Sequence, residues 1–272
     1  MPDQECVRFL QWALPRMGFR WAGFRRVRRQ VRRRLKRRLL ELGLRDVGRY
    51  RGYLGEHPEE WRRLEDLCRI TISRFFRDRR VFQRLGDRVL PRLAREAMAR
   101  GESRLRIWSA GCGAGEEPYS LTSLRRHESA EALRRVDFEI VATDADAHQL
   151  KRARIAEYRA SSLREVREEW RGEALERLGE DLYRLRASYR EGVVFALQDL
   201  RQEVPSGTFD LILCRNLAFT YFAEHEQRRL LRRLRERLRP AGALVIGSHE
   251  ILPVLERLRP TEEDRCIFRF PT

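Results

Sequence analysis

The stretch IWSAGCGAGEEPYSL, residues 107–121, decides the fold of this protein. An apolar run breaks into glycines at alternate positions, which are Gly111, Gly113 and Gly115. A strand that ends in a glycine-rich turn and leads into a helix brings backbone N–H groups close to a ligand. Dinucleotide sites use a related turn, so the stretch alone predicts a ligand-binding strand–turn–helix unit and leaves its ligand open.

Two adjacent acids follow the glycines and bear on the nature of the ligand. Glu116 and Glu117 occupy the helix N-terminus that would otherwise welcome an anion. One of them can stabilise that terminus through the helix dipole. The other can meet a cationic ligand group, such as an ammonium or a sulfonium.

Further runs of β-branched and apolar residues surround this stretch, and charged helical segments separate most of them. The runs are RLRIWSAG (104–111), VDFEIVATDAD (136–146), GVVFALQDL (192–200), FDLILCRN (209–216) and GALVIGSHE (242–250). Alternating strands and helices predict an α/β fold with an open, mostly parallel sheet. The long charged stretch 160–192 predicts one helix and a small hairpin, within residues 181–195, that projects from the sheet.

Polar residues stand where the predicted strands end. Asp144 suits a bidentate hydrogen bond to a ribose diol, and Asp146 is interpreted as a helix N-cap. Asp199 can reach an adenine amino group from the third strand. Arg215 and Asn216 end the fourth strand at the carboxyl edge of the sheet, where ligands bind in such folds. This combination favours S-adenosylmethionine over a dinucleotide.

The N-terminal part has a helical pattern instead. The stretch 20–40 carries eleven basic residues and no acid. An apolar stripe at a spacing of four runs along it, formed by Val27, Val31, Leu35 and Leu39. Its cationic remainder is either a solvated helix face or a docking surface for an anionic partner. We expect a helical domain with its linker over residues 1–85 and a ligand-binding domain over residues 86–272.

Composition sets outer limits on the function. A net charge of +17 over 272 residues permits nucleic acid, a membrane surface or an acidic protein as partner. Only Lys36 and Lys151 are lysines among the 58 basic residues, so coding bias contributes to this charge. The five cysteines are scattered without metal-ligand spacing, and no run approaches ~20 apolar residues. These features predict a cytoplasmic protein without a structural metal and without membrane insertion.

Several of these stretches together resemble the CheR family of chemotaxis-receptor glutamate methyltransferases. They are SRFFRD (73–78), the glycine stretch, ATDAD (142–146), FDLILCRN and GSHE (247–250). The resemblance covers nearly the whole chain. It implies a Rossmann-like class I methyltransferase domain, preceded by a small all-helical domain, and a flap over residues 160–192 that is shorter than the receptor-tethering flap of enterobacterial members. It also implies S-adenosylmethionine as donor, S-adenosylhomocysteine as product and methyl transfer to a side-chain carboxylate.

The resemblance also assigns residues to a site. Arg77 would lie beside the methyl donor and be critical for activity, and Ser73 stands where the family usually has a cofactor-contacting threonine. The remaining predicted cofactor contacts are Gly111, Gly113, Glu117, Asp144, Asp199, Leu200, Cys214, Arg215 and Asn216. The basic N-terminal helix would correspond to a surface that faces acidic receptor helices.

This sequence departs from the family pattern near the acceptor. CRNLAFTYF is one residue longer than the family's stretch, so Tyr221 is the predicted active-site tyrosine and Thr220 the alternative. The family reads GHSE where this chain reads GSHE, which can redirect His249. His249 is a better candidate than His225 if the acceptor must lose a proton. Cys112, inside the glycine turn, is interpreted as a small filler.

A glutamate carboxylate is already ionised at neutral pH and needs no general base to attack a methyl sulfonium. Catalysis would then come from alignment and desolvation, with Arg77 orienting the carboxylate and Tyr221 hydrogen bonding near the reacting centre. Three alternatives stay open: the same donor with a small carboxylate or a non-receptor protein as acceptor, a binding module without turnover, and a nucleic-acid methyltransferase. The last lacks an NPPY-like motif, so nucleic acid is the less favoured partner. The oligomeric state is not predicted.

Overall fold

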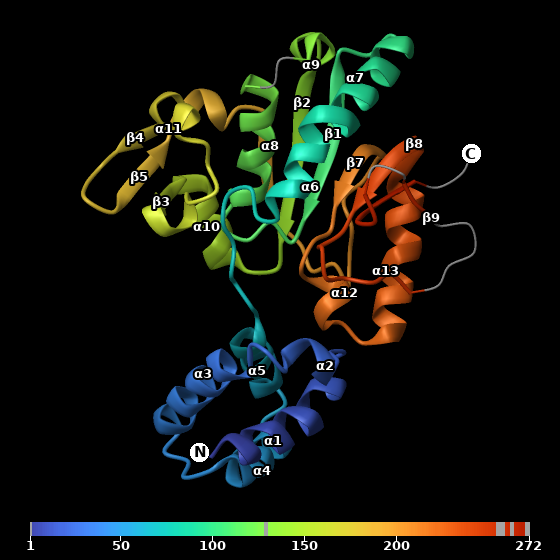
Figure 1. Cartoon of the computed structure of the whole chain (residues 1–272). Helices are drawn as coiled ribbons and strands as arrows, with labels where there is room; N and C mark the ends of the chain where they lie inside the picture. Colours follow the sequence, from blue (N-terminus) through green and yellow to red (C-terminus); the bar gives the residue numbers. More distant parts are fainter. Residues whose placement is uncertain (1, 128–129, 254–258, 262–263, 270–272) are drawn as a thin grey trace. The chain divides into compact units, whose positions relative to one another are not determined.

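The chain folds as two compact units in the computed structural model, which describes residues 2–127, 130–253, 259–261 and 264–269 (Figure 1). The helical unit comprises Met1–Thr71 together with Ala218–Gln227, and the sheet unit comprises Ile72–Leu217 together with Arg228–Thr272. The chain therefore passes from one unit to the other three times. The division falls after Thr71, whereas the sequence placed it after residue 85, so the SRFFRD stretch belongs to the sheet unit.

The helical unit is built from amphipathic helices, as the sequence predicted. Its helices are α1 (Asp3–Arg16), α2 (Trp21–Phe24), α3 (Arg28–Glu41), α4 (Val47–Glu56), α5 (Glu60–Cys68) and α12 (Ala218–Tyr221). The basic helix α3 buries Val31, Leu35 and Leu39 on one stripe and leaves its basic residues at the surface. Burial of that stripe offsets the charge repulsion along the rest of α3.

One polar network lies inside the helical unit. Glu60 is buried and accepts hydrogen bonds from Arg38 at both carboxylate oxygens, with Nε 2.9 Å from Oε1 and Nη2 2.7 Å from Oε2. The Tyr50 hydroxyl donates to the same Oε1 at 2.7 Å. Arg38 also donates from Nη1 to Glu41. This bidentate geometry compensates the buried charge of Glu60.

The main sheet of the sheet unit has the order β6-β2-β1-β7-β8-β10-β9. Its strands are β1 (Arg104–Ala110), β2 (Asp137–Asp144), β6 (Val193–Leu197), β7 (Phe209–Leu213), β8 (Leu238–Val245), β9 (Arg259–Pro260) and β10 (Ile267–Arg269). The five strands expected from the sequence pair in parallel, and β10 runs antiparallel to both β8 and β9. The mostly parallel α/β fold is confirmed, and the carboxyl ends of β1, β2, β6 and β7 share one edge of the sheet.

Helices precede β1 and connect the strands that follow it. They are α6 (Arg79–Arg84), the π-helical turn η1 (Leu85–Val89), α7 (Leu90–Ala99), α8 (Glu116–His127), α9 (Glu131–Arg134), α10 (Ala147–Ile155) and α13 (Glu224–Arg237), the last of which begins in the helical unit. The glycine stretch indeed forms the turn between β1 and α8. In the described part of the chain, no helix is long and apolar enough to cross a membrane.

The stretch between β2 and β6 forms a small separate sheet with the order β3-β5-β4 (Figure 1). Its elements are β3 (Glu157–Arg159), η2 (Ala160–Ser162), α11 (Glu168–Ala174), β4 (Leu175–Arg177), β5 (Leu182–Leu185) and η3 (Ala187–Tyr189). The predicted hairpin over residues 181–195 is wrong, because its two strands do not pair with each other. β5 pairs back with β4, whereas the apolar run that begins at Val193 pairs in parallel with β2, where it extends the main sheet.

Candidate functional site

The glycine turn after β1 has the left-handed backbone that its sequence suggested. Gly111, Gly113 and Gly115 have φ angles of 81°, 56° and 91°, a region that residues with a side chain rarely adopt. A Cβ on Gly111 would also lie 2.3 Å from Cδ2 of Leu217, which follows β7. The turn therefore needs glycine at this position both for its conformation and for the close approach of Leu217.

The two acids that follow β2 have different partners. Asp144 accepts the Gly113 N–H at 2.8 Å with one oxygen and the Asp146 N–H at 2.9 Å with the other. Asp146 accepts the N–H groups of His148 and Gln149, which confirms it as the N-cap of α10. Asp144 thus ties the tip of β2 to the glycine turn.

Arg215 at the tip of β7 connects three parts of the sheet unit. Its side chain is only 3% exposed, and its guanidinium lies over the ring of Phe82 at 5.0 Å. Nη1 donates to Glu117 Oε2 at 3.0 Å, and Nη2 donates to Asp78 Oδ2 at 2.9 Å and to the Arg77 carbonyl at 2.6 Å. Arg215 therefore fixes the FFRD stretch beside the first turn of α8.

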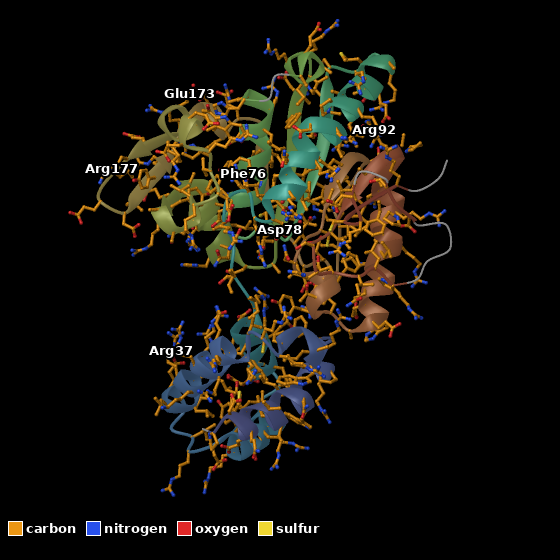
Figure 2. The ribbon with its side chains drawn as sticks, in the orientation of Figure 1. Arg37, Phe76, Asp78, Arg92, Glu173 and Arg177 are labelled. Carbon is orange, nitrogen blue, oxygen red and sulfur yellow. The ribbon has the colours of Figure 1, made fainter. Side chains whose placement is uncertain are left out.

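Asp78 is held in its charged form by these contacts. Burial by itself raises the pKa of Asp78, but Arg215 and a hydrogen bond from Asn216 outweigh it and hold that pKa below its usual range. The second oxygen of Glu117 accepts the Ser109 hydroxyl at 2.8 Å. Phe76 and Asp78, labelled in Figure 2, both have positive φ angles, of 51° and 63°. Such strain on both sides of Arg77 is typical of functional sites.

Glu116, the other acid of the stretch, lies deeper. It is 2% exposed, and its Oε2 has no hydrogen-bond partner among the described residues. Burial raises the pKa of its carboxyl, and a hydrogen bond from Ser73 opposes that shift. A buried acid with an unpartnered oxygen is costly unless a ligand group pairs with it. The Glu116 carboxylate, which lies beside the glycine turn, therefore fits the ammonium of an amino-acid moiety.

The loop after β7 is fastened by a residue that sequence reasoning missed. Glu250 is buried and accepts the N–H groups of Asn216 at 2.7 Å, Leu217 at 3.0 Å and Gly247 at 2.8 Å. These bonds stabilise Asn216 in a left-handed conformation with φ 54°. The available signal was the acid that ends both GSHE and the family's GHSE. Sequence reasoning had instead named the neighbouring His249, which is exposed.

Comparisons with known proteins agree with this arrangement. Residues 71–266 match the family model described as CheR methyltransferase, SAM binding domain. The chain belongs to the CheR methyltransferase family. Residues 71–266 therefore form a domain of the S-adenosylmethionine-dependent methyltransferase class, and the reaction product of that class is S-adenosylhomocysteine.

Named relatives support the same family. A chemotaxis protein methyltransferase of Listeria monocytogenes is 36% identical over 184 residues, which are 68% of this chain and 66% of the relative, just under two thirds of its length. A protein of the same name from Escherichia coli is 31% identical over 80% of this chain and 75% of the relative. The solved structure of the glycopeptide N-methyltransferase MtfA with sinefungin is 14% identical at a TM-score of 0.34, covering 58% of this chain and 53% of that one, which is too distant to bear on function.

The sheet unit contains almost all of the site residues that the sequence and the CheR resemblance named. They are Ser73, Arg77, Gly111, Gly113, Glu117, Asp144, Asp199, Leu200, Cys214, Arg215 and Asn216. Ser73 lies against the turn, because a Cβ on Gly113 would be 3.7 Å from the Ser73 Cβ. Arg77 is half-buried and donates to the Ile72 carbonyl at 2.6 Å. Their roles toward a cofactor stay predictions.

Three of these residues have surroundings that refine their expected roles. Asp199 forms an ion pair with Arg201, with Oδ2 2.5 Å from Nη2, so an adenine amino group would have to share this acid. Leu200 and Cys214 are buried and offer apolar contact at the strand ends. Burial raises the pKa of Cys112 well above its ordinary value, which agrees with its interpretation as a filler.

Tyr221 belongs to a different unit from the other predicted site residues. It ends α12, and the whole segment Ala218–Gln227 belongs to the helical unit. This placement could not be predicted from the sequence, because Tyr221 follows Asn216 closely along the chain. Among the described residues, no group of His, Cys, Asp and Glu is arranged to hold a metal ion.

Proposed function

We propose that this protein transfers the methyl group of S-adenosylmethionine to the side-chain carboxylate of a glutamate in an acidic, chemoreceptor-like protein helix. The observation that carries the proposal is the Arg215 network. It joins Glu117, Asp78 and the Arg77 carbonyl into one cluster at the carboxyl edge of the sheet. Arg77, the residue expected beside the methyl donor, is thereby held next to the acids expected at the cofactor.

The residues at this edge suit the parts of S-adenosylmethionine in turn. Asp144 would accept the ribose hydroxyls, Glu116 and Glu117 would face the ammonium, and Leu200 would pack against the adenine. When bound there, the cofactor supplies a methyl group on a sulfonium, which is a strong electrophile that leaves as a neutral thioether. Both acids stand in the first turn of α8, where the fold holds them, so they need no reorganisation to meet the ligand.

The chemical task of the protein side chains is alignment. A glutamate carboxylate is ionised at neutral pH, so the reaction needs a nucleophile that is positioned and stripped of water. Arg215 holds the Arg77 carbonyl and so fixes the backbone from which the Arg77 guanidinium would orient the acceptor carboxylate. Alignment of this kind supplies at most about 7–11 kcal/mol of the barrier.

The helical unit offers a surface for an anionic partner. The exposed basic side chains of α3 recur at helical spacing, and they are Arg29, Arg33, Lys36 and Arg37. Arg37 has 71% of its side chain exposed and projects from the surface of α3 (Figure 2). An acidic helix would complement this face, and the attraction would weaken as salt screens it.

The proposal is tested by a radiolabelled methyl-transfer assay on acidic helical peptides that carry glutamate at the acceptor position, with a cell extract assayed in parallel. The matched control peptides carry glutamine there. Label on the glutamate peptide alone, released by mild alkali as methanol, is the expected result. Arg77→Ala should abolish transfer while the circular dichroism spectrum and melting temperature stay unchanged.

Other outcomes of the same assay would contradict the proposal in distinct ways. Label that resists alkali would exclude a carboxyl ester. Label that appears only on small molecules of a cell extract would keep the methyl donor and replace the protein acceptor by a small carboxylate. Normal turnover by Arg77→Ala would remove Arg77 from the mechanism.

A further inference from the structure

The segment Ala218–Gln227, here called the tyrosine segment, has an unexpected place in the fold. It follows directly on Arg215, Asn216 and Leu217 of the cofactor edge, yet it belongs to the helical unit. Its first four residues form the single helical turn α12, which ends at Tyr221. The position of Tyr221 is therefore determined by residues of the helical unit that are about 200 positions away in sequence.

Arg20 secures the end of this turn. The carbonyls at the end of so short a helix have no partner within it. Arg20 donates from Nη2 to the Phe219 carbonyl at 2.5 Å, from Nε to the Thr220 carbonyl at 3.0 Å and from its backbone N–H to the Tyr221 carbonyl at 2.8 Å. One residue thus binds three consecutive carbonyls, up to and including that of Tyr221.

Gly23 allows the close approach that these bonds require. A Cβ at this position would lie 2.2 Å from the Thr220 carbonyl oxygen and 3.1 Å from Cδ1 of Tyr221. The next residue, Phe24, packs its ring edge-to-face on Tyr221 with centroids 5.0 Å apart. Helix α2 therefore contacts both the backbone and the ring of the tyrosine segment, and any side chain at Gly23 would push them apart.

Further bonds hold the rest of the segment. Phe19 and Phe222 form an antiparallel bridge, and the Ala223 N–H donates to the Gly18 carbonyl at 2.8 Å. Gln227 is buried and donates from Nε2 to the Phe222 carbonyl at 2.9 Å. The tyrosine segment is thus anchored on both sides of Tyr221, which leaves its backbone little freedom.

From these contacts we propose that Arg20 and Gly23 are positioning residues for methyl transfer, because they fix the backbone and ring of Tyr221. This inference rests on the proposed role of Tyr221 in the reaction. Arg20 acts through Tyr221 and touches neither substrate nor cofactor in this account.

The anchoring is tested first by hydrogen exchange, which needs no acceptor. Arg20→Ala and Gly23→Ala should speed exchange in peptides that cover Ala218–Gln227, while peptides from α3 and β1 keep their wild-type rates. Arg26→Ala is the matched control, since Arg26 is an exposed arginine of the same region. Wild-type protection of the tyrosine segment in Arg20→Ala would overturn the proposal.

The functional part is tested by kinetics and a double-mutant cycle. Arg20→Ala should lower kcat roughly 10- to 100-fold, as expected for a misplaced group, while S-adenosylhomocysteine binds with unchanged Kd in calorimetry. Arg20→Lys should recover part of the loss. In a Tyr221→Phe background, Arg20→Ala should lower kcat little further, because both substitutions act through the Tyr221 side chain.

Two results separate failure of this inference from failure of the proposed function. Independent, multiplying losses in Arg20→Ala and Tyr221→Phe, or a loss that appears only in cofactor affinity, would overturn positioning through Tyr221. A wild-type enzyme that leaves glutamate peptides unlabelled would overturn the proposed acceptor, and the cycle would then be run on the acceptor that the extract assay labels.

Discussion

Each of the two units contains an arginine that bridges acids, and the two networks differ in one respect. In the helical unit, Arg38 uses Nε, Nη1 and Nη2 on Glu60 and Glu41. In the sheet unit, Arg215 binds Glu117 and Asp78, but its buried Nε has no partner among the described residues. Similar chemistry thus produces one saturated network and one that is incomplete.

We interpret the saturated Arg38 network as structural and the incomplete Arg215 network as functional. A saturated buried network helps to specify a fold, whereas proteins often retain unsatisfied polar groups at functional sites. Glu116, in the first turn of α8, also has a buried oxygen without a partner among the described residues. We therefore expect substitutions around Arg215 to affect ligand binding and stability together, and substitutions around Arg38 to affect stability alone.

The largest effect is expected for Arg215→Ala. It leaves Glu117 and Asp78 as uncompensated acids, so the free energy of unfolding should fall by about 3–5 kcal/mol. Affinity for S-adenosylhomocysteine should fall roughly 30-fold or more. Urea unfolding and calorimetry measure the two effects, and Arg232→Ala, an exposed arginine of α13, is the control. Wild-type affinity in folded Arg215→Ala would show that this network is structural too.

Glu60→Gln tests the opposite network. Arg38 would lose its bidentate partner, and because Arg38 is 21% exposed we expect a cost of about 3 kcal/mol, at the lower end for a buried pair. Affinity for S-adenosylhomocysteine should not change. Hydrogen exchange of α4 and α5 peptides, together with calorimetry, measures both quantities. A lower affinity would mean that the saturated network also serves the ligand.

The same pair predicts a pH dependence for the helical unit. The hydrogen bonds from Arg38 hold the pKa of Glu60 below its usual range, despite the opposing effect of burial. A lowered folded-state pKa contributes stability above the unfolded pKa of about 4.3, and this is lost as pH falls through the folded value. Protection of α4 and α5 should therefore decline with acid in the wild type and decline less steeply in Glu60→Gln.

Gly111→Ala should have an intermediate effect of about 2 kcal/mol. The left-handed backbone and the contact with Leu217 both oppose a methyl group at this position. A second substitution, Leu217→Ala, should remove the clash and leave only the backbone strain. Gly52→Ala in α4 is the matched control, because nothing lies within 4 Å of its added Cβ, and it should stabilise slightly. Thermal unfolding of the wild type and these three variants distinguishes these contributions.

The cofactor edge could be predicted from the sequence because strand ends are local features. An apolar run followed by glycines or an acid marks the tip of a strand, so Gly111, Asp144 and Arg215 were identified together. Their partners could not be predicted. Asp78 lies 137 residues from Arg215, and the choice of that acid depends on how α6 packs beside β7.

The acceptor side was less predictable for the same reason. The stretch 218–227 has no periodicity that distinguishes a place in the sheet unit from one in the helical unit, and its anchors at Arg20 and Gly23 are remote in sequence. The predicted pairing of the two hairpin strands was wrong because Leu182 and Val193 both begin short apolar strands. Only the open edge of the main sheet beside β2 decides which strand joins it.

The smallest effect distinguishes two acids that stand two residues apart. Asp146 caps α10, so Asp146→Ala should cost about 1 kcal/mol of stability and leave the affinity for S-adenosylhomocysteine nearly unchanged. Asp144 bonds the glycine turn at Gly113, so Asp144→Asn, which keeps the shape and removes the charge, should weaken affinity more than stability. Calorimetry measures the loss of affinity and thermal unfolding measures the loss of stability, and the two losses are compared within each variant. An equal loss of affinity in both would mean that α10 as a whole, rather than the Asp144 carboxylate, shapes the cofactor edge.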